Sequence, residues 1–284
     1  MNINLLSFNV SIGKKKPRTI KGYKPADSAC PFCAVDKLVD IIDTDGSIIL
    51  LKNKYQVIEN SYQLVLIEND VCHSDIPDYT PEHLYKLMHF ALSHWVDMVN
   101  SGKYEVTILF KNFGPFSGGT ITHPHMQIVG FPEIQPELMF DPAEFAGITA
   151  FSSDGIEVNM ATRPHVAFTE INIIATEAAY PAGTNFIKGY QQHQPGHKII
   201  LPETRSINTM ADMIQQTITF LQEIHPSPSF SYNLFFYLYD GRIHLKVMPR
   251  FPTSPLFIGY NIHFTSTNIQ DLATRLTTHL TTHI

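Results

Sequence analysis

The chain has 284 residues, of which 44% are hydrophobic and 16% are charged, and its formal net charge is −6 at pH 7. This length and composition allow a large core, in one large domain or in two closely packed halves. The acidic balance argues against non-specific nucleic-acid binding. No stretch reaches the roughly 18 apolar residues of a transmembrane helix, and no long apolar segment follows Leu5-Leu6 as in a secretory signal. We therefore expect neither a membrane nor nucleic acid as a partner.

The first half of the chain predicts an α+β unit behind an irregular lead-in. Residues 1–29 are polar and contain Pro17 and Pro25, so we expect no regular structure there, and the basic run at 14–18 is expected to be a solvated arm. Runs rich in β-branched and other apolar residues predict strands at 47–53, 62–68 and 106–112.

Residues 80–102 predict a long helix between the second and third of these strands. Thr80 can cap its start, Pro81 suits its first position, and Gly102 suits its end. Apolar residues recur at helical spacing between these signals, so one face of the helix is expected to pack on the core.

The second half of the chain repeats this plan. Residues 197–203 predict a strand, residues 206–225 predict a helix that Ser206 or Asn208 can cap, and residues 268–284 predict a closing helix. Residues 232–252 predict a hairpin that turns at Asp240-Gly241.

The two halves therefore suggest a degenerate internal duplication. Each half runs strand, helix, strand, turn and strand, and each ends its last strand close to a Phe-Pro pair. In this alignment His244 and Lys246 stand roughly where His123 and His125 stand, so the second half lacks a complete set of site residues. One half would keep the chemistry, and the other would supply scaffold and part of the substrate pocket.

The segment THPHMQIVGFP at 122–132 places polar side chains at alternating positions of an expected strand. Residues i, i+2 and i+4 of a strand face the same way, so His123, His125 and Gln127 would crowd one face. Such crowding is an unusual way to build a core and is typical of a functional site.

The cysteines suggest a metal site. Cys30, Cys33 and Cys72 are too few and too clustered for a disulfide framework, so we expect reduced thiols and a cytoplasmic location. The C-x-x-C pair can hold half of a zinc site, and His73 and His123 are the histidines that best complete it. Cys72 competes with His73, because neighbouring residues of an extended chain face opposite ways. The alternatives are a redox pair, or a chance pair with His73 as an ordinary turn residue.

Four motifs in this order resemble the galactose-1-phosphate uridylyltransferase-like branch of the histidine-triad (HIT) superfamily, of which the chain looks like a divergent member. They are C-P-F-C at 30–33, H-S-D at 73–75, F-K-N-F-G at 110–114 and G-T-I-T-H-P-H-M-Q at 119–127. The resemblance implies a HIT-like α+β fold with two degenerate repeats of an antiparallel sheet with packed helices. The chain would divide into the lead-in at 1–29, a catalytic half with a zinc site at 30–135, and a second half without a complete site at 150–284.

The resemblance also implies roles for single residues. In the family, a structural zinc ion is held at the positions of Cys30, Cys33, His73 and His123. His125 takes the place of the nucleophile, and Gln127 and Asn112 take the places of residues that contact the nucleotide phosphate. Thr120 replaces a serine that donates a hydroxyl hydrogen bond, and Asn53 matches an asparagine that touches the nucleoside.

The chemistry implied by the family suits these residue types. A neutral imidazole can attack the α-phosphorus of a nucleoside diphosphate ester and form a covalent nucleotidyl-histidine. Developing charge on the phosphoryl oxygens needs fixed donors, and the backbone amides of Ser117, Gly118 and Gly119 are candidates because glycines let the backbone approach a phosphate.

The resemblance thus implies a zinc-containing nucleotidyltransferase with a nucleotide or nucleotide-sugar substrate. Alternatives are a dinucleoside polyphosphate phosphorylase or a nucleotide hydrolase, which differ in the acceptor, and a non-catalytic zinc-stabilised nucleotide-binding protein. Gln127 stands where the hydrolase branch has a third histidine, and a neutral amide cannot supply a proton at pH 7, which favours transfer over hydrolysis.

The second half departs from the family pattern. In FIGYNIHFTSTN at 257–268, Asn261 stands where the family has a hexose-binding glutamate, so galactose is not implied as a substrate. Lys246 and Arg250 are two cations that either bind a phosphate of the acceptor or lie on a solvated hairpin edge. Family members often form dimers, so a homodimer is an expectation as well.

Overall fold

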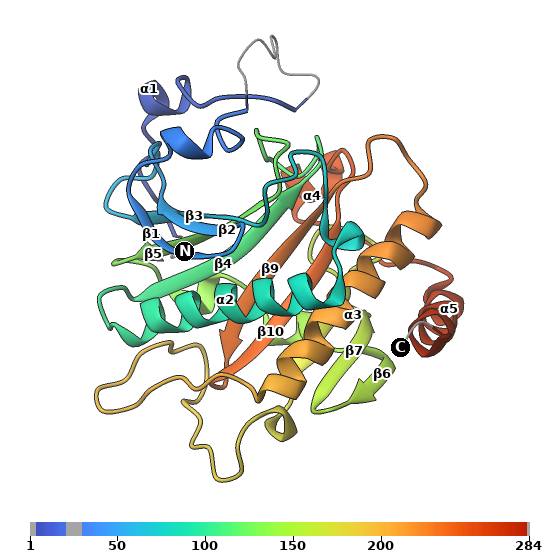
Figure 1. The fold of residues 1–284 in the computed structure, drawn as a ribbon. Helices are drawn as coiled ribbons and strands as arrows, with labels where there is room; N and C mark the ends of the chain where they lie inside the picture. The colour runs from blue at the N-terminus through green and yellow to red at the C-terminus, as the bar shows by residue number, and fades with distance from the viewer. Residues whose placement is uncertain (1–3, 21–29, 283–284) are drawn as a thin grey trace.

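The computed structural model describes residues 4–20 and 30–282, which form one ten-stranded antiparallel sheet with helices packed against it. Figure 1 shows the sheet twisting through the molecule, with the first half of the chain in blue and green and the second in yellow and red. The order of its strands is β1-β2-β3-β5-β4-β9-β10-β8-β7-β6. The α+β class expected from the sequence is confirmed.

Each half contributes five strands. The first half forms β1 (Ile41–Asp45), β2 (Ile48–Lys52), β3 (Tyr62–Ile67), β4 (Val106–Phe113) and β5 (His125–Phe131). The second half forms β6 (Gly147–Ser153), β7 (Ile156–Ala161), β8 (Ile171–Ala175), β9 (Tyr232–Tyr239) and β10 (Arg242–Pro249).

Five α-helices lie in the described chain, namely α1 (Val10–Gly13), α2 (Pro81–Asn100), α3 (Thr204–Ile224), α4 (Pro255–Tyr260) and α5 (Ile269–Thr282). Short 3-10 turns occur at Val35–Lys37, Ile76–Asp78, Pro136–Leu138, Pro142–Phe145 and Glu177–Ala179. None of the described helices is long and apolar enough to cross a membrane.

The strand order of the first half is repeated in the second half, as an internal duplication would produce. Reading from the two edges of the sheet inward, the first half runs 1-2-3-5-4 and the second runs 6-7-8-10-9, so the two orders are the same. The halves meet where β4 pairs antiparallel with β9, in a register that sets Phe110 opposite Phe235 and Asn112 opposite Asn233. We call this pairing the seam.

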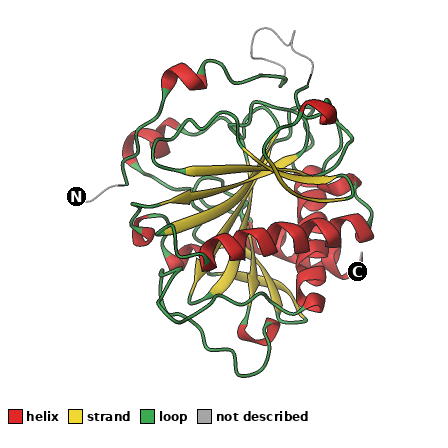
Figure 2. Ribbon diagram, turned by 60° about the vertical axis from the view of Figure 1, so that its left-hand side comes forward, coloured by secondary structure: helices red, strands yellow, loops and turns green. Residues whose placement is uncertain are grey.

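The two faces of the sheet differ. Helices α2 and α3 cross the same face, which we call the helix face (Figures 1 and 2). Met126 and Ile128 point into the large apolar core on that side. His125 and Gln127 alternate with them and point to the opposite, open face, as the period of a strand requires.

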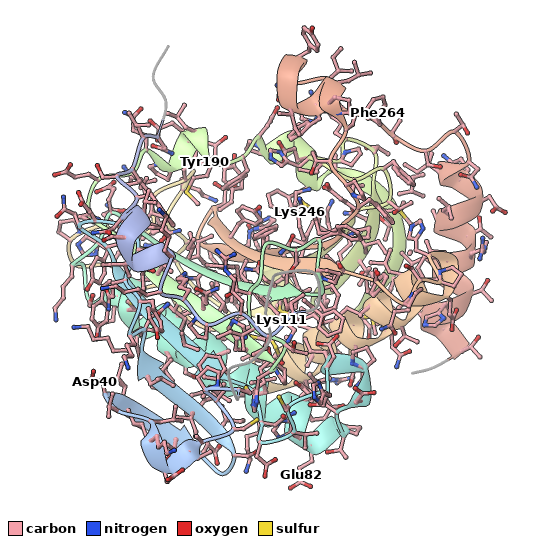
Figure 3. All side chains as sticks on the ribbon, turned by 90° about the horizontal axis from the view of Figure 1, so that it is seen from above. Asp40, Glu82, Lys111, Tyr190, Lys246 and Phe264 are labelled. Carbon is pink, nitrogen blue, oxygen red and sulfur yellow. The ribbon has the colours of Figure 1, made fainter. Side chains whose placement is uncertain are left out.

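A buried ionic cluster lies on the helix face, next to β5. Lys111 Nζ lies 2.5 Å from Glu68 Oε1 and 3.2 Å from Asp75 Oδ1, and these three side chains are buried. Tyr79 donates a hydrogen bond to Glu68, and Tyr232 of the second half donates to Asp75. Burial raises the pKa of Asp75 to about 6, although Lys111 opposes the shift. Figure 3 shows Lys111 well inside the molecule, as is Lys246 of the second half.

Most elements expected from the sequence are present. Helix α2 is capped by the Thr80 hydroxyl and starts at Pro81, and the hairpin between β9 and β10 turns through Asp240 and Gly241, which both have positive φ. The closing helix α5 ends at Thr282, and residues 283–284 lie outside the described part of the chain.

Three expectations were wrong in detail. Residues 197–203 form no strand, because the Asn100 side chain bonds both backbone groups of Ile199 and takes the place of a neighbouring strand. Helix α3 begins at Thr204, so neither Ser206 nor Asn208 caps it, and Ser206 instead donates to Asp154 O. The lead-in contains the short helix α1 and bonds to Val57, and the part of this expectation that concerns residues 1–3 and 21–29 lies outside the described residues.

Replacing Lys111 with Met should strongly destabilise the protein. The change leaves Glu68 and Asp75 buried without a compensating charge, which costs about 3–5 kcal/mol. Urea unfolding followed by circular dichroism measures this loss. Lys86→Met is the matched control, because the Lys86–Asp45 pair is exposed and should contribute less than about 1 kcal/mol. Equal effects of the two variants would contradict a stabilising role for the buried cluster.

Candidate active site and metal centre

A cavity of about 420 Å³ lies on the open face, lined in part by His125 and Gln127 of β5, which we call the site strand. Its floor includes Phe32, Leu51 and Val65, which form a small apolar cluster with their neighbours. An apolar floor with a few polar groups at one end is typical of a small-molecule site. Seven of the sequence-predicted substrate-binding and catalytic residues line it, namely Asn53, Asn112, Gly118, Gly119, Thr120, His125 and Gln127, whereas Ser117 does not.

The cavity is a cationic environment in an acidic protein. Four lysines are among its lining residues, namely Lys16, Lys37, Lys52 and Lys54, and no carboxylate is among the described residues that line it. Lys16 is half-buried and makes no ion pair with the described residues, and burial lowers its pKa. The expectation of a fully solvated basic arm is therefore wrong at this residue. The arm contacts the loop between β4 and β5 through Thr19, whose N–H donates to Thr120 O at 2.8 Å.

A backbone hydrogen bond holds His125 in one tautomer. Its Nδ1 lies 2.8 Å from His123 O, and because a carbonyl oxygen only accepts, Nδ1 carries the proton. In the neutral ring Nε2 is then the unprotonated nitrogen, and it has no hydrogen-bond partner among the described residues. Burial also lowers the pKa of His125 to about 4. The ring is therefore neutral and offers a lone pair.

The loop between β4 and β5 supplies few free amides. The Ser117 N–H donates to Gly114 O, and the Gly119 N–H donates to Ser117 Oγ, so only the Gly118 amide of the three expected donors is unbonded within the described chain. Gly114 has φ +80°, and a Cβ there would lie 2.4 Å from Phe230 O. The glycine of the F-x-N-x-G motif is thus required by a close approach of the second half of the chain.

A second cluster lies beside the cavity, at the start of the site strand. The ligand atoms of Cys30, Cys33, Cys72 and His123 all lie within 4.8 Å of one another. A tight turn presents the first two, since the Cys33 N–H donates to Cys30 O. Three of these residues were expected as metal ligands from the sequence, and the fourth, Cys72, was weighed as a competitor of His73.

The structure brings Cys72 rather than His73 into this cluster. His73 is exposed, whereas Cys72 is half-buried beside the other two sulfurs. The reason is that the chain turns before Cys72, whereas the sequence argument assumed an extended segment. The Asn69 side chain accepts from the Val71 N–H at 2.8 Å and turns the loop just before Cys72.

The cluster fits a tetrahedral metal ion. His123 Nδ1 lies 3.6 Å from Cys30 Sγ and 3.5 Å from Cys33 Sγ. Two ligands at about 2.3 Å (sulfur) and about 2.1 Å (nitrogen) from a zinc ion would be roughly 3.6 Å apart at the tetrahedral angle. His123 Nε2 donates to Asn69 O at 2.8 Å, which leaves Nδ1 free to bind a metal. Burial and the two neighbouring sulfurs raise the pKa of Cys72 to about 12, so a metal ion would have to displace its thiol proton on binding.

The second half contains an altered copy of the site. His244 Nδ1 lies 3.1 Å from Arg242 O, the same bond to the residue two positions earlier that His125 makes. With the Phe110–Phe235 pair as the centre of the seam, the strand registers relate His244 to His125 and Lys246 to Gln127. The alignment expected from the sequence, which set these residues against His123 and His125, was therefore wrong by two residues.

This altered copy is filled by polar side chains. Asn172 and Asn159 stand in register where the first half has Val65 and Leu51. Lys246 lies fully buried between Glu170 Oε2, at 3.4 Å, and Asn172 Oδ1, at 3.1 Å. Lys246 is thus neither a solvated edge residue nor a phosphate ligand.

Some site residues could not be found from the sequence. Lys16 and Phe32 lie far from the site strand in sequence, and only the fold brings them to the cavity. Arg250, expected as a phosphate ligand or a solvated cation, instead donates to Asn233 Oδ1 at 3.0 Å.

Comparison with known proteins gives a family match. Residues 8–134 match the N-terminal domain, and residues 189–280 the C-terminal domain, of DUF4931, which is described as a domain of unknown function. The crystal structure of a DUF4931 family protein from Bacillus cereus ATCC 10987 is 37% identical, with a TM-score of 0.67 over 85% of this chain and 100% of that chain. No curated protein matches the sequence.

More distant structures share the fold. A uridylyltransferase is 13% identical, with a TM-score of 0.68 over 93% of this chain and 94% of that chain. An ADP-glucose phosphorylase from Arabidopsis thaliana, solved with bound ADP-glucose, is 14% identical, with a TM-score of 0.65 over 90% and 92% of the two chains. The HIT-like fold of the uridylyltransferase group that the motifs implied is thereby confirmed.

Proposed function

The chain belongs to the DUF4931 family, and we propose that it is a nucleotidyltransferase that forms a covalent nucleotidyl-histidine at His125. The observation that carries this proposal is the hydrogen bond from His125 Nδ1 to His123 O, at 2.8 Å. It keeps the proton on Nδ1 and leaves Nε2 as a nucleophile in a ring that lines the cavity.

The reaction proceeds as two displacements. His125 Nε2 attacks the α-phosphorus of a nucleoside diphosphate ester, a P–N bond forms, and the P–O bond to the leaving phosphate breaks. An acceptor oxygen then attacks the same phosphorus and releases His125. The protein has little covalent chemistry to supply beyond the imidazole, so positioning and charge stabilisation carry most of the rate.

The polar end of the cavity supplies these interactions. The Asn112 amide, the Gln127 amide, the Thr120 hydroxyl and the Gly118 N–H are the donors that would contact the phosphoryl oxygens. Asn53 and the apolar floor would hold the nucleoside. The ADP-glucose phosphorylase with the same fold, solved with bound ADP-glucose, favours a nucleotide sugar as the donor substrate.

The acceptor is proposed to carry a phosphate. Lys16 is a cation without an ion pair in the described chain, and it lies at a cavity that also contains His125. A phosphate-bearing acceptor, or inorganic phosphate as in a phosphorylase, would complete this charge, whereas water would not. Gln127 favours the same conclusion, because its neutral amide cannot supply a proton for hydrolysis.

Zinc is proposed as a structural ion held by Cys30, Cys33, Cys72 and His123. Three sulfurs and one imidazole are donors that zinc prefers, and a closed set of four protein ligands is typical of structural sites. When bound, the ion would fix the backbone of His123, whose carbonyl orients His125. Residues 30–135 would then be the catalytic half, and residues 150–284 the half without a complete site.

The first prediction concerns the nucleophile. Zinc-loaded protein mixed with UDP-glucose, ADP-glucose, GDP-glucose or a diadenosine polyphosphate should gain the mass of one nucleoside monophosphate with at least one donor. His125→Ala should abolish the adduct, because no other described residue at the cavity presents an unprotonated ring nitrogen. Intact-mass spectrometry at neutral pH gives both the adduct and the identity of the base.

His244→Ala is the matched control for this experiment. His244 is buried like His125, makes the same bond to the residue two positions earlier, and has a pKa that burial also lowers to about 4. It does not line the cavity, so the variant should still form the adduct. Absence of an adduct from the wild type with every donor, while the fold is intact, would count against the proposed reaction.

The second prediction concerns the metal ligands. Cys72→Ser should lower the zinc content after dialysis as much as Cys30→Ser does, because each removes one of four ligands. His73→Ala should leave the zinc content unchanged, since His73 is exposed. Elemental analysis by inductively coupled plasma mass spectrometry measures both. Loss of zinc from the His73 variant alone would restore the ligand set expected from the sequence.

The third prediction concerns Lys16. Lys16→Met should raise the KM for a phosphate-bearing acceptor by roughly tenfold, the loss expected for one charge-assisted contact. Adduct formation from the donor should change much less. Lys14→Met is the control, because Lys14 is exposed on the same arm and does not line the cavity. Equal KM values for the two variants would remove Lys16 from the acceptor site.

A further inference from the structure

Two asparagines face each other across the seam, one from each half of the chain. Asn112 of β4 and Asn233 of β9 are directly paired in the register, and both lie on the open face. Asn112 lines the cavity, whereas Asn233 is buried beside it and does not. Arg250 follows β10 and contacts Asn233 from the other side.

The orientation of the Asn233 amide is determined by its neighbours. Its Oδ1 accepts from Arg250 Nη1 at 3.0 Å, and its Nδ2 donates to Ser117 O at 3.1 Å. An arginine can only donate, and a carbonyl oxygen can only accept, so the reversed amide would lose both bonds. The second proton of Nδ2 is then directed at Asn112 Oδ1, at 2.6 Å.

The Asn112 amide is oriented in turn. Its Oδ1 is engaged by Asn233, and its Nδ2 has no partner among the described residues, so Asn112 offers hydrogen-bond donors to the cavity. We propose that Arg250 and Asn233 are positioning residues, which fix the Asn112 amide so that its NH₂ group, and not its oxygen, meets the substrate phosphate. This inference rests on the proposed function, because the NH₂ group is useful only if an anion binds at Asn112.

Which end of the Asn112 amide faces the phosphate matters more than whether the side chain reaches it. An amide that is free to turn over would present its carbonyl oxygen to a phosphoryl oxygen, and two acceptors repel each other. Fixing the donor in advance avoids this loss, as preorganised sites do. The arrangement has a cost, since Arg250 Nε is buried without a hydrogen-bond partner in the described chain. An apolar residue would avoid this cost but could not set the polarity.

Asn233→Asp tests the proposal by reversing polarity at nearly constant shape. An aspartate accepts from Arg250 as before, but it cannot donate to Ser117 O, and it can pair with Asn112 only if the Asn112 amide turns over. The substrate phosphate then meets a carbonyl oxygen. The dissociation constants of UMP, AMP, GMP and CMP are measured by isothermal titration calorimetry, and the tightest nucleotide is used for all variants. We expect Asn233→Asp to weaken its binding roughly 10- to 100-fold, the range for one lost hydrogen bond to a charged group.

Asn233→Leu separates polarity from structural support. Leucine makes none of the hydrogen bonds of the Asn233 side chain, so a purely structural role predicts that it is at least as harmful as aspartate. If the orientation of the Asn112 amide matters, this amide can adopt either orientation in Asn233→Leu, but only the wrong one in Asn233→Asp. Asn233→Leu should then bind the nucleotide more tightly than Asn233→Asp. The opposite order, in variants with equal melting temperatures, would overturn the proposal.

A double-mutant cycle with Asn112→Ala removes the effect of the new charge. Without the Asn112 amide, Asn233→Asp should cost little further affinity, because the group that it misorients is gone. An undiminished cost in that background would mean that the aspartate acts by repelling the phosphate directly, and would overturn the proposal. Arg250→Lys, which keeps a donor at this position, should bind more tightly than Arg250→Met.

The orientation can also be measured without a ligand. The side-chain NH₂ signals of Asn112, assigned by their loss in Asn112→Asp, should exchange rapidly with water in the wild type and slowly in Asn233→Asp, where they are bonded. If the wild type binds no nucleotide but shows this change, the proposed function fails and the orienting role stands. If nucleotides bind and the signals do not change, the orienting role fails alone.

Discussion

The pairing of β4 with β9 is the constraint on which the rest of the structure depends. Because side chains alternate along a strand, this one register assigns Tyr232 to the helix face, where it donates to the buried Asp75, and Asn233 to the open face, where it holds Asn112. A slip by one residue would exchange the two faces and break both contacts. The buried ionic cluster and the cavity on the open face are therefore fixed by the same set of backbone hydrogen bonds.

The fold could be predicted to the extent that local signals determine it. Helix α2 has both a capping threonine and a proline at its start, and the hairpin after β9 has an Asp-Gly turn, so each was recognisable alone. Residues 197–203 misled because their apolar pattern is that of a strand, while their partner is the side chain of Asn100. Strand pairing is a long-range property, and a single sequence does not reveal which partner a segment will find.

The site was predictable where its residues share one strand and less so elsewhere. The alternation of His125 and Gln127 placed both on one face, and both line the cavity. The choice between Cys72 and His73 depended on a turn set by the Asn69 side chain, which periodicity cannot describe. Lys16 and Asn233 reach the site only through the packing of distant segments, so no local pattern marks them.

The two halves form within one chain what two identical subunits would form as a symmetric dimer. In such a dimer every residue at the interface faces an identical copy of the surface, and any substitution appears twice. In a single chain this restriction is absent. Asn112 can therefore face a hydrogen-bond partner, Asn233, while the residue at the matching position of the other half can differ. A single chain also makes the association independent of protein concentration, since the second half is always present at a fixed effective concentration. Dilution therefore cannot separate Asn112 from Asn233, its hydrogen-bond partner in the other half.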